Sequence, residues 1–195
     1  MEPRKLLDII KIAERLKDTT RHCYTSGGRH ESVAEHSWMT TLMAFFLQDE
    51  FPEADMDKVI RMCLVHDIGE AVTGDIPTFE KTEAHEDIER RALDDLINTL
   101  PAPWPEELRA LFAEMEAQET LEAKIYKSLD RMEAIQQHNE ADIATWLPLE
   151  YDLNLTYGVK QAEFSPYLKN LRAEMLEITR EKIRKAGENM EDNHE

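Results

Sequence analysis

Two adjacent residues, His66 and Asp67, carry the clearest signal of chemistry in this sequence. They lie in the segment MCLVHDIGEAVTGDIP, with His36 upstream and Asp130 downstream. Imidazole nitrogens and carboxylate oxygens suit divalent Zn, Fe, Ni, Co or Mn, and a metal that keeps open positions can activate water. The two histidines and two aspartates therefore predict a metal site and a metal-dependent hydrolase.

The first and last of these residues fall in predicted helices. The segment 32–35, SVAE, fits a capping box and starts a helix that runs to about residue 48 and carries His36. A longer helix over residues 119–141 carries Asp130 on or near its apolar stripe. A charged side chain in such a position needs a partner, and a metal ion would supply one.

The central pair lies on a third predicted helix. Asp55 or Asp57 caps its start, and Gly74 ends it, as glycine commonly does just past a helix. On a continuous helix His66 and Glu70, four residues apart, would share one face. A lone histidine or a lone HD dipeptide is a weak signal, but the order H…HD…D on separate helices is far more specific.

The remaining apolar periodicity completes an all-α fold. It predicts further helices over residues 3–17, 82–100, 107–116 and 166–185. Residues 17–31 are expected to form a loop and residues 142–164 to be less regular, and no convincing alternating strand pattern occurs. We therefore expect a single domain over residues 1–186, followed by a flexible acidic tail at 187–195.

Composition and charge restrict the function. The 195 residues include 42% hydrophobic and 33% charged residues, which favours a helix-rich globular protein. A formal net charge of −18 argues against binding a nucleic-acid polymer or an anionic membrane, although a small phosphorylated substrate remains compatible. Cys23 and Cys63 form neither a disulfide framework nor a CxxC site. Without a signal-peptide pattern or a membrane-length apolar run, we expect a soluble cytoplasmic protein.

Three segments carry a family resemblance: ESVAEHSWMTTLMAFFL, LVHDIGEAVTGDIPT and EAKIYKSLDRMEAI. In these segments the sequence resembles the HD-domain phosphohydrolase superfamily, and more closely its small, single-domain 5′-nucleotidase branch. The resemblance implies an HD-domain helical bundle that binds one divalent cation, which could be Co, Mn, Zn, Fe, Ni or Mg. The implied ligands are His36, His66, Asp67 and Asp130.

The same resemblance implies roles for residues around the metal. Glu70 would activate or position the attacking water, Asp67 could help to protonate the leaving group, and Arg21 would orient the phosphate. His22 stands where some relatives have an aromatic residue, and Lys81 is a second basic candidate near the phosphate. The segment that would hold the nucleotide consists of Asp75, Ile76, Pro77 and Thr78.

The implied reaction is hydrolysis of a ribo- or deoxyribonucleoside 5′-monophosphate to nucleoside and phosphate. One alternative is an HD phosphohydrolase that acts on another phosphoester, and another is a nucleotide sensor without activity. A two-metal oxygenase needs more histidines, and His85 is the only one between Asp67 and Asp130. Relatives are commonly homodimers, and the apolar residues of 142–185 could form such an interface or complete the core.

Overall fold

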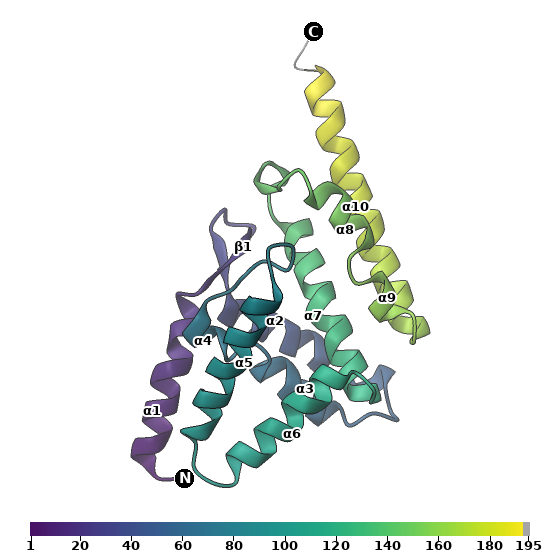
Figure 1. Ribbon diagram of the computed structural model, residues 1–195. Coiled ribbons are helices and arrows are strands. Elements are labelled where there is room, and N and C mark those ends of the chain that lie inside the picture. The colour runs from purple at the N-terminus through teal and green to yellow at the C-terminus, as the bar shows by residue number, and fades with distance from the viewer. Residues whose placement is uncertain (193–195) are drawn as a thin grey trace. The chain divides into compact units, whose positions relative to one another are not determined.

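The backbone is built mainly of helices, as the computed structural model of the protein shows for residues 1–192, with side chains described through residue 188 (Figure 1). The α-helices are α1 (Pro3–Ala13), α2 (Val33–Phe46), α3 (Met56–Val65), α4 (Glu70–Thr73), α5 (Glu83–Asn98), α6 (Trp104–Ala117), α7 (Leu121–Glu140), α8 (Glu150–Thr156), α9 (Val159–Ala162) and α10 (Pro166–Asp192). Short 3-10 helices cover Glu14–Lys17, Gln48–Glu50 and Ile143–Thr145. The predicted all-α class is confirmed.

The region predicted as a loop, residues 17–31, differs from the prediction because part of it forms β-strands. They contain the two strands β1 (Thr20–Tyr24) and β2 (His30–Ser32), which pair in a two-stranded sheet. Gly28, with φ of +80°, lies in the turn between them. The strands are short and mostly polar, so they carry no alternating pattern that would reveal them in the sequence.

The described chain divides into two compact units. The first contains residues 1–22 and 31–126, and the second contains residues 23–30 and 127 onward. The expectation of one domain over residues 1–186 stays a prediction. Helix α10 continues to Asp192, beyond its expected end near residue 185. The last part of the expected flexible tail, residues 193–195, lies outside the described residues.

In the first unit, α2 packs against α3, and both begin at the expected caps. The Ser32 side chain accepts the backbone N–H of Glu35, whose carboxylate in turn accepts the N–H of Ser32. Asp55 caps α3 by accepting the N–H of Lys58. Each such cap satisfies backbone donors that a helix start leaves free. The buried apolar side chains of these two helices include Val33, Ala44, Val59, Met62 and Cys63.

Helix α3 does not continue to Gly74 as predicted. It ends at Val65, and α4 begins at Glu70. Residues 66–69 between the two helices form turns, which are closed by backbone hydrogen bonds between residues three apart in the sequence. The N–H of Ile68 donates to Val65 O at 3.0 Å, and the N–H of Glu70 donates to Asp67 O at 3.0 Å. The expected sharing of one helix face by His66 and Glu70 is therefore wrong, because the helix breaks between them.

The second unit contains most of α7 together with α8, α9 and α10, and α10 packs against the other two (Figure 1). Its buried side chains include Leu129, Met132, Ile135, Leu168 and Met175. Trp146 is also buried and donates from its indole N–H to His138 O, whereas Leu147 is exposed. The segment 142–164 thus contributes both to the core of this unit and to its surface.

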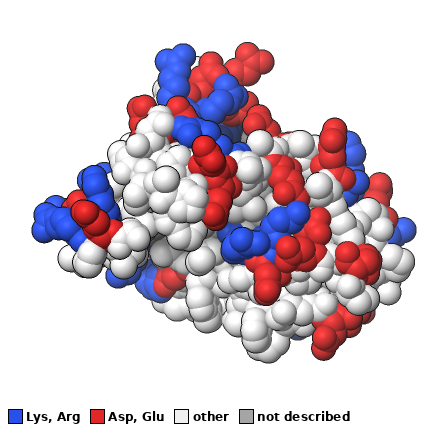
Figure 2. Space-filling view, turned by 90° about the horizontal axis from the view of Figure 1, so that it is seen from below, with Lys and Arg blue, Asp and Glu red and all other residues white. Residues whose placement is uncertain are grey.

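The distribution of surface charge and the hydropathy of the helices can be compared with what nucleic-acid or membrane binding requires. On the face drawn in Figure 2, basic side chains are interspersed with acidic ones and form no continuous basic track. Among the described helices, none is long and apolar enough to cross a membrane.

Candidate metal centre

Two histidines from different elements meet in the first unit. His36 lies in the first turns of α2, where its side chain is only 1% exposed, and its carbonyl accepts the hydroxyl of Thr40. His66 caps the end of α3, and its Nδ1 lies 2.8 Å from Cys63 O. A carbonyl can only accept, so this nitrogen carries the proton and Nε2 keeps its lone pair. The contact thus fixes the tautomer that a metal ligand needs.

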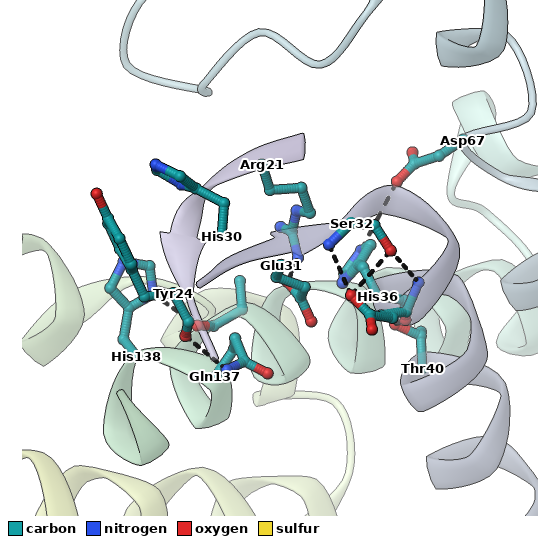
Figure 3. A network of polar contacts seen from close by, with 12 residues as sticks. Arg21, Tyr24, His30, Glu31, Ser32, His36, Thr40, Asp67, Gln137 and His138 are labelled. Atoms are coloured by element: carbon teal, nitrogen blue, oxygen red, sulfur yellow. Dashed lines mark hydrogen bonds and ion pairs between the residues drawn. The ribbon is translucent and has the colours of Figure 1, made fainter. Parts of the chain in front are cut away.

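The carboxylate of Asp67 joins these two imidazoles. Its Oδ2 lies 3.0 Å from Nε2 of His66 and 3.8 Å from Nε2 of His36, and the two Nε2 atoms are 3.2 Å apart. Figure 3 shows Asp67 pointing toward His36. The helix break after Val65 lets the adjacent residues 66 and 67 converge on one point, whereas neighbours within a regular helix diverge.

These three side chains fit a divalent cation. Nitrogen and oxygen ligands bind such a metal at about 2.0–2.2 Å, which separates the ligand atoms by roughly 3–3.5 Å. The three distances between His36, His66 and Asp67 lie close to that range. Two imidazoles and one carboxylate also form a donor set that leaves coordination positions for water and substrate.

Glu70 adds a buried carboxylate beside this triad. Its Oε2 is buried and has no hydrogen-bond partner among the described residues. Burial, followed by the negative charges of Asp67 and Asp75, raises the pKa of Glu70 to about 10. A cluster of carboxylates that destabilise one another's charged forms is stabilised by a nearby cation. The charge distribution therefore agrees with the ligand geometry.

Asp75 belongs to the same acidic cluster. It follows Gly74, whose φ of +80° turns the chain away from α4. Burial raises the pKa of Asp75, and the negative charge of Asp67 adds to this, whereas the positive charge of Arg21 opposes it. These mutual effects place the side chains of Asp67, Glu70, Asp75 and Arg21 within one electrostatic neighbourhood.

The two basic candidates are held by acidic partners. Arg21 on β1 donates from a guanidinium nitrogen to Glu31 Oε2 on β2 at 2.9 Å, as Figure 3 shows, and Glu31 is only 2% exposed. Lys81 Nζ lies 2.6 Å from Glu89 Oε2 on α5. Burial tends to lower the pKa of Lys81, but the hydrogen bond and charge of Glu89 outweigh it and the pKa is raised. The side chains of Arg21 and Lys81 are thus positively charged, and each is oriented by an acidic partner.

The predicted nucleotide-binding segment forms a turn after Asp75. Ile76 and Pro77 are half-buried and Thr78 is exposed. Sequence reasoning missed the next residue, Phe79, whose ring meets that of His22 edge to face with centroids 5.3 Å apart. An apolar residue directly after the DIPT segment was a signal that could have found it.

Asp130, the last predicted ligand, lies on α7 in the second unit. Its carboxylate accepts a hydrogen bond from Lys127 Nζ at 2.7 Å, and its side chain is 16% exposed. The structure brings together His36, His66 and Asp67 of the predicted ligand set, and Asp130 stays a prediction.

Comparison with known proteins decides the family. The family model described as "HD domain" matches residues 13–172. The chain belongs to the HD domain family. Among HD-domain relatives, the 5′-deoxynucleotidase HDDC2 of Homo sapiens is 34% identical over 142 residues, which cover 70% of this chain and 68% of the relative. The 5′-deoxynucleotidase hdd1 of Schizosaccharomyces pombe is 31% identical over 149 residues, covering 70% and 74%.

Solved structures with the same HD fold agree. A crystal structure described as a predicted metal-dependent phosphohydrolase from Magnetospirillum magnetotacticum MS-1 aligns with a TM-score of 0.78 and 28% identity, covering 92% of this chain and 93% of that one. A conserved hypothetical protein from Pyrococcus furiosus aligns with a TM-score of 0.69 and 28% identity, covering 89% and 99%. The resemblance expected from the sequence is confirmed.

Proposed function

We propose that this HD-domain protein is a metal-dependent phosphohydrolase that converts deoxynucleoside 5′-monophosphates to deoxynucleosides and phosphate. The observation that carries the proposal is the convergence of His36 Nε2, His66 Nε2 and Asp67 Oδ2, with a buried Glu70 carboxylate beside them. The substrate class is supported by relatives named 5′-deoxynucleotidases.

His36, His66 and Asp67 would hold one divalent cation, and Asp130 would be its fourth ligand. The support for Asp130 is its place in the H…HD…D order on a helix with buried apolar neighbours. When bound, such a cation lowers the pKa of water and polarises a phosphoryl oxygen.

Glu70 would act as the general base. The positive charge of a bound cation would favour the ionised form of this carboxyl group, and its unpartnered Oε2 could then accept a proton from the water that attacks phosphorus. As the new P–O bond forms, the bond from phosphorus to O5′ breaks and the leaving deoxynucleoside alkoxide takes up a proton. Asp67 lies beside the metal position and would help to deliver that proton.

Arg21 and the segment after α4 would orient the nucleotide. The guanidinium of Arg21 presents a planar fork of donors that matches two phosphate oxygens, and Glu31 holds its orientation. Lys81, fixed by Glu89, adds a second positive charge. Asp75, Ile76, Pro77 and Thr78 would line the sugar, and His22 would lie near the sugar or base.

We further propose that the enzyme acts as a homodimer in the cytoplasm. Support for the dimer is the exposed apolar side chains Leu147 and Leu149 in the segment 142–164. Support for the cytoplasm is that the sequence contains only two cysteines, Cys23 and Cys63, which is not the cysteine-rich composition of a small disulfide-stabilised secreted domain.

Phosphate release from a panel of ribo- and deoxyribonucleoside monophosphates tests the proposal. Metal-stripped protein would be reloaded with Co, Mn, Zn or Mg and compared with Asp67→Asn and with the exposed control Asp87→Asn. We expect metal-dependent release, preferentially from deoxyribonucleotides, that is lost in Asp67→Asn and kept in the control. Stoichiometric metal binding without turnover of any member would contradict it.

A further inference from the structure

The aromatic pair of His22 and Phe79 offers a binding surface that the reaction at the metal does not use. We propose that Phe79 is the residue on which the nucleobase of the substrate stacks, with His22 supporting its ring. This inference rests on the proposed function, because it assigns the part of the nucleotide that the hydrolytic residues leave unbound.

The backbone presents Phe79 at the tip of a tight turn. The N–H of Glu80 donates to Pro77 O at 2.8 Å, which closes a turn with Phe79 at its third position. Directly after it, Thr82 caps α5 by accepting the N–H of His85. The turn is therefore fixed at both ends, and its position is set by Gly74 and by the start of α5.

His22 orients the ring. The two ring planes meet at 86°, an edge-to-face arrangement that aromatic pairs favour. Such a contact covers at most one face of Phe79, and the residue is 37% exposed. Part of a positioned aromatic ring is thus accessible to a ligand.

This ring lies close to the groups assigned to the phosphate and sugar. His22 directly follows Arg21 on β1, and Phe79 is four residues past Asp75. The charges of Arg21, Asp67 and His22 all act on the pKa of Asp75, so the Asp75 carboxylate lies near the metal ligand Asp67 as well as near His22 of the aromatic pair. A nucleotide with its phosphate at Arg21 and its sugar at Asp75 would extend its base toward Phe79.

Stacking on Phe79 also predicts how the site would select among nucleobases. Every nucleobase has a π-face, so an aromatic platform holds bases without reading their hydrogen-bonding edges. We therefore expect the enzyme to accept several bases, with purines bound more tightly because their faces are larger.

The test compares substrates with and without a base. Phe79→Ala and Phe79→Trp would be assayed on deoxynucleoside monophosphates and on 2-deoxyribose 5-phosphate, and Kd values for the nucleotides would be measured by calorimetry. The control is Phe46→Ala, an exposed phenylalanine at the end of α2, ten residues from His36.

We expect Phe79→Ala to raise KM and Kd for every deoxynucleotide by roughly 5- to 150-fold, and to leave kcat/KM for 2-deoxyribose 5-phosphate within about twofold. Phe79→Trp should retain nucleotide binding, and Phe46→Ala should match the wild type. An equal loss on both substrate classes, or no loss on either, would overturn the inference while leaving wild-type turnover intact.

Failure of the proposed function gives a different pattern. If the wild type hydrolyses no nucleotide but Phe79→Ala still weakens nucleotide binding, the hydrolytic proposal falls and the stacking surface stands. If the wild type neither hydrolyses nor binds nucleotides, both proposals are overturned.

Discussion

The Nε2 atoms of His36 and His66 lie 3.2 Å apart, although the residues come from different helices. Because Nδ1 of His66 donates to Cys63 O, its Nε2 faces His36 with a lone pair. A cation placed between two such nitrogens binds the folded state and not the unfolded chain. Metal binding and stability are therefore coupled at this pair.

This coupling predicts a metal-dependent rise in thermal stability. At free Co²⁺ or Zn²⁺ one hundred times above Kd, the wild type should gain about 2.7 kcal/mol of unfolding free energy. Calorimetric melting of stripped and reloaded protein measures the gain. His36→Ala should lose it, whereas His85→Ala, which changes a capping residue of α5, should keep it. An unchanged gain in His36→Ala would exclude His36 as a ligand.

Substitution of Glu70 should separate catalysis from metal binding. Glu70→Gln keeps the shape of the side chain but cannot accept the proton, so kcat should fall about 10²- to 10⁴-fold. Metal content, measured on the same sample, should stay at the wild-type level. Glu86→Gln, an exposed change on α5, is the matched control. Near-normal kcat in Glu70→Gln would assign the base elsewhere.

The raised pKa of Glu70 also predicts how stability depends on pH in metal-free protein. The folded state holds this proton up to a pKa of about 10, whereas the unfolded chain releases it near the ordinary value of 4.5. Between these values the folded state binds more protons, so its stability falls as pH rises.

Urea unfolding of wild type and Glu70→Gln at pH 6 and pH 9 isolates this contribution, since glutamine does not titrate. The variant should gain stability relative to the wild type as pH rises, by up to about 1.4 kcal/mol for each pH unit. Parallel pH profiles for the two proteins would refute the prediction.

Arg21 should affect both phosphate binding and folding, and the two effects can be separated. Arg21→Ala leaves the buried Glu31 carboxylate without this partner, so it should cost about 3 kcal/mol of stability as well as activity. Arg21→Lys keeps the charge but loses the planar fork, and KM should rise about tenfold with little loss of stability.

A double variant, Arg21→Ala with Glu31→Gln, checks this separation by chemical unfolding and steady-state kinetics. It should recover most of the lost stability and none of the lost phosphate affinity. Recovery of normal KM in the double variant would show that Arg21 serves only to neutralise Glu31.

Local signals explain which parts of this fold could be predicted from the sequence. The Ser32–Glu35 capping box and the Asp55 cap each join groups that are only three residues apart in the sequence, and the structure contains both caps. The break after Val65 was missed because the apolar pattern continues through it. At this end of the helix the side chain of His66 contacts Cys63 O, and a contact of that kind leaves no mark on the apolar periodicity.

Long-range pairing limited the prediction of the site. The residue types of His36, His66 and Asp67 indicated a metal centre, but their distances depend on how α2 packs against α3. The partners of Arg21 and Lys81, Glu31 and Glu89, could not be predicted either, because glutamate is a common surface residue and only the fold brings each one against its cation. Phe79 was missed because its role depends on contact with His22.

The most direct test of this account measures bound metal and phosphate release on one sample of His66→Ala. Removing this imidazole takes away one of three converging ligand atoms. We expect the variant to lose both the metal and the hydrolysis of deoxynucleoside monophosphates while remaining folded by circular dichroism. A folded variant that has lost the metal but still hydrolyses these substrates would contradict metal-dependent hydrolysis at His36, His66 and Asp67.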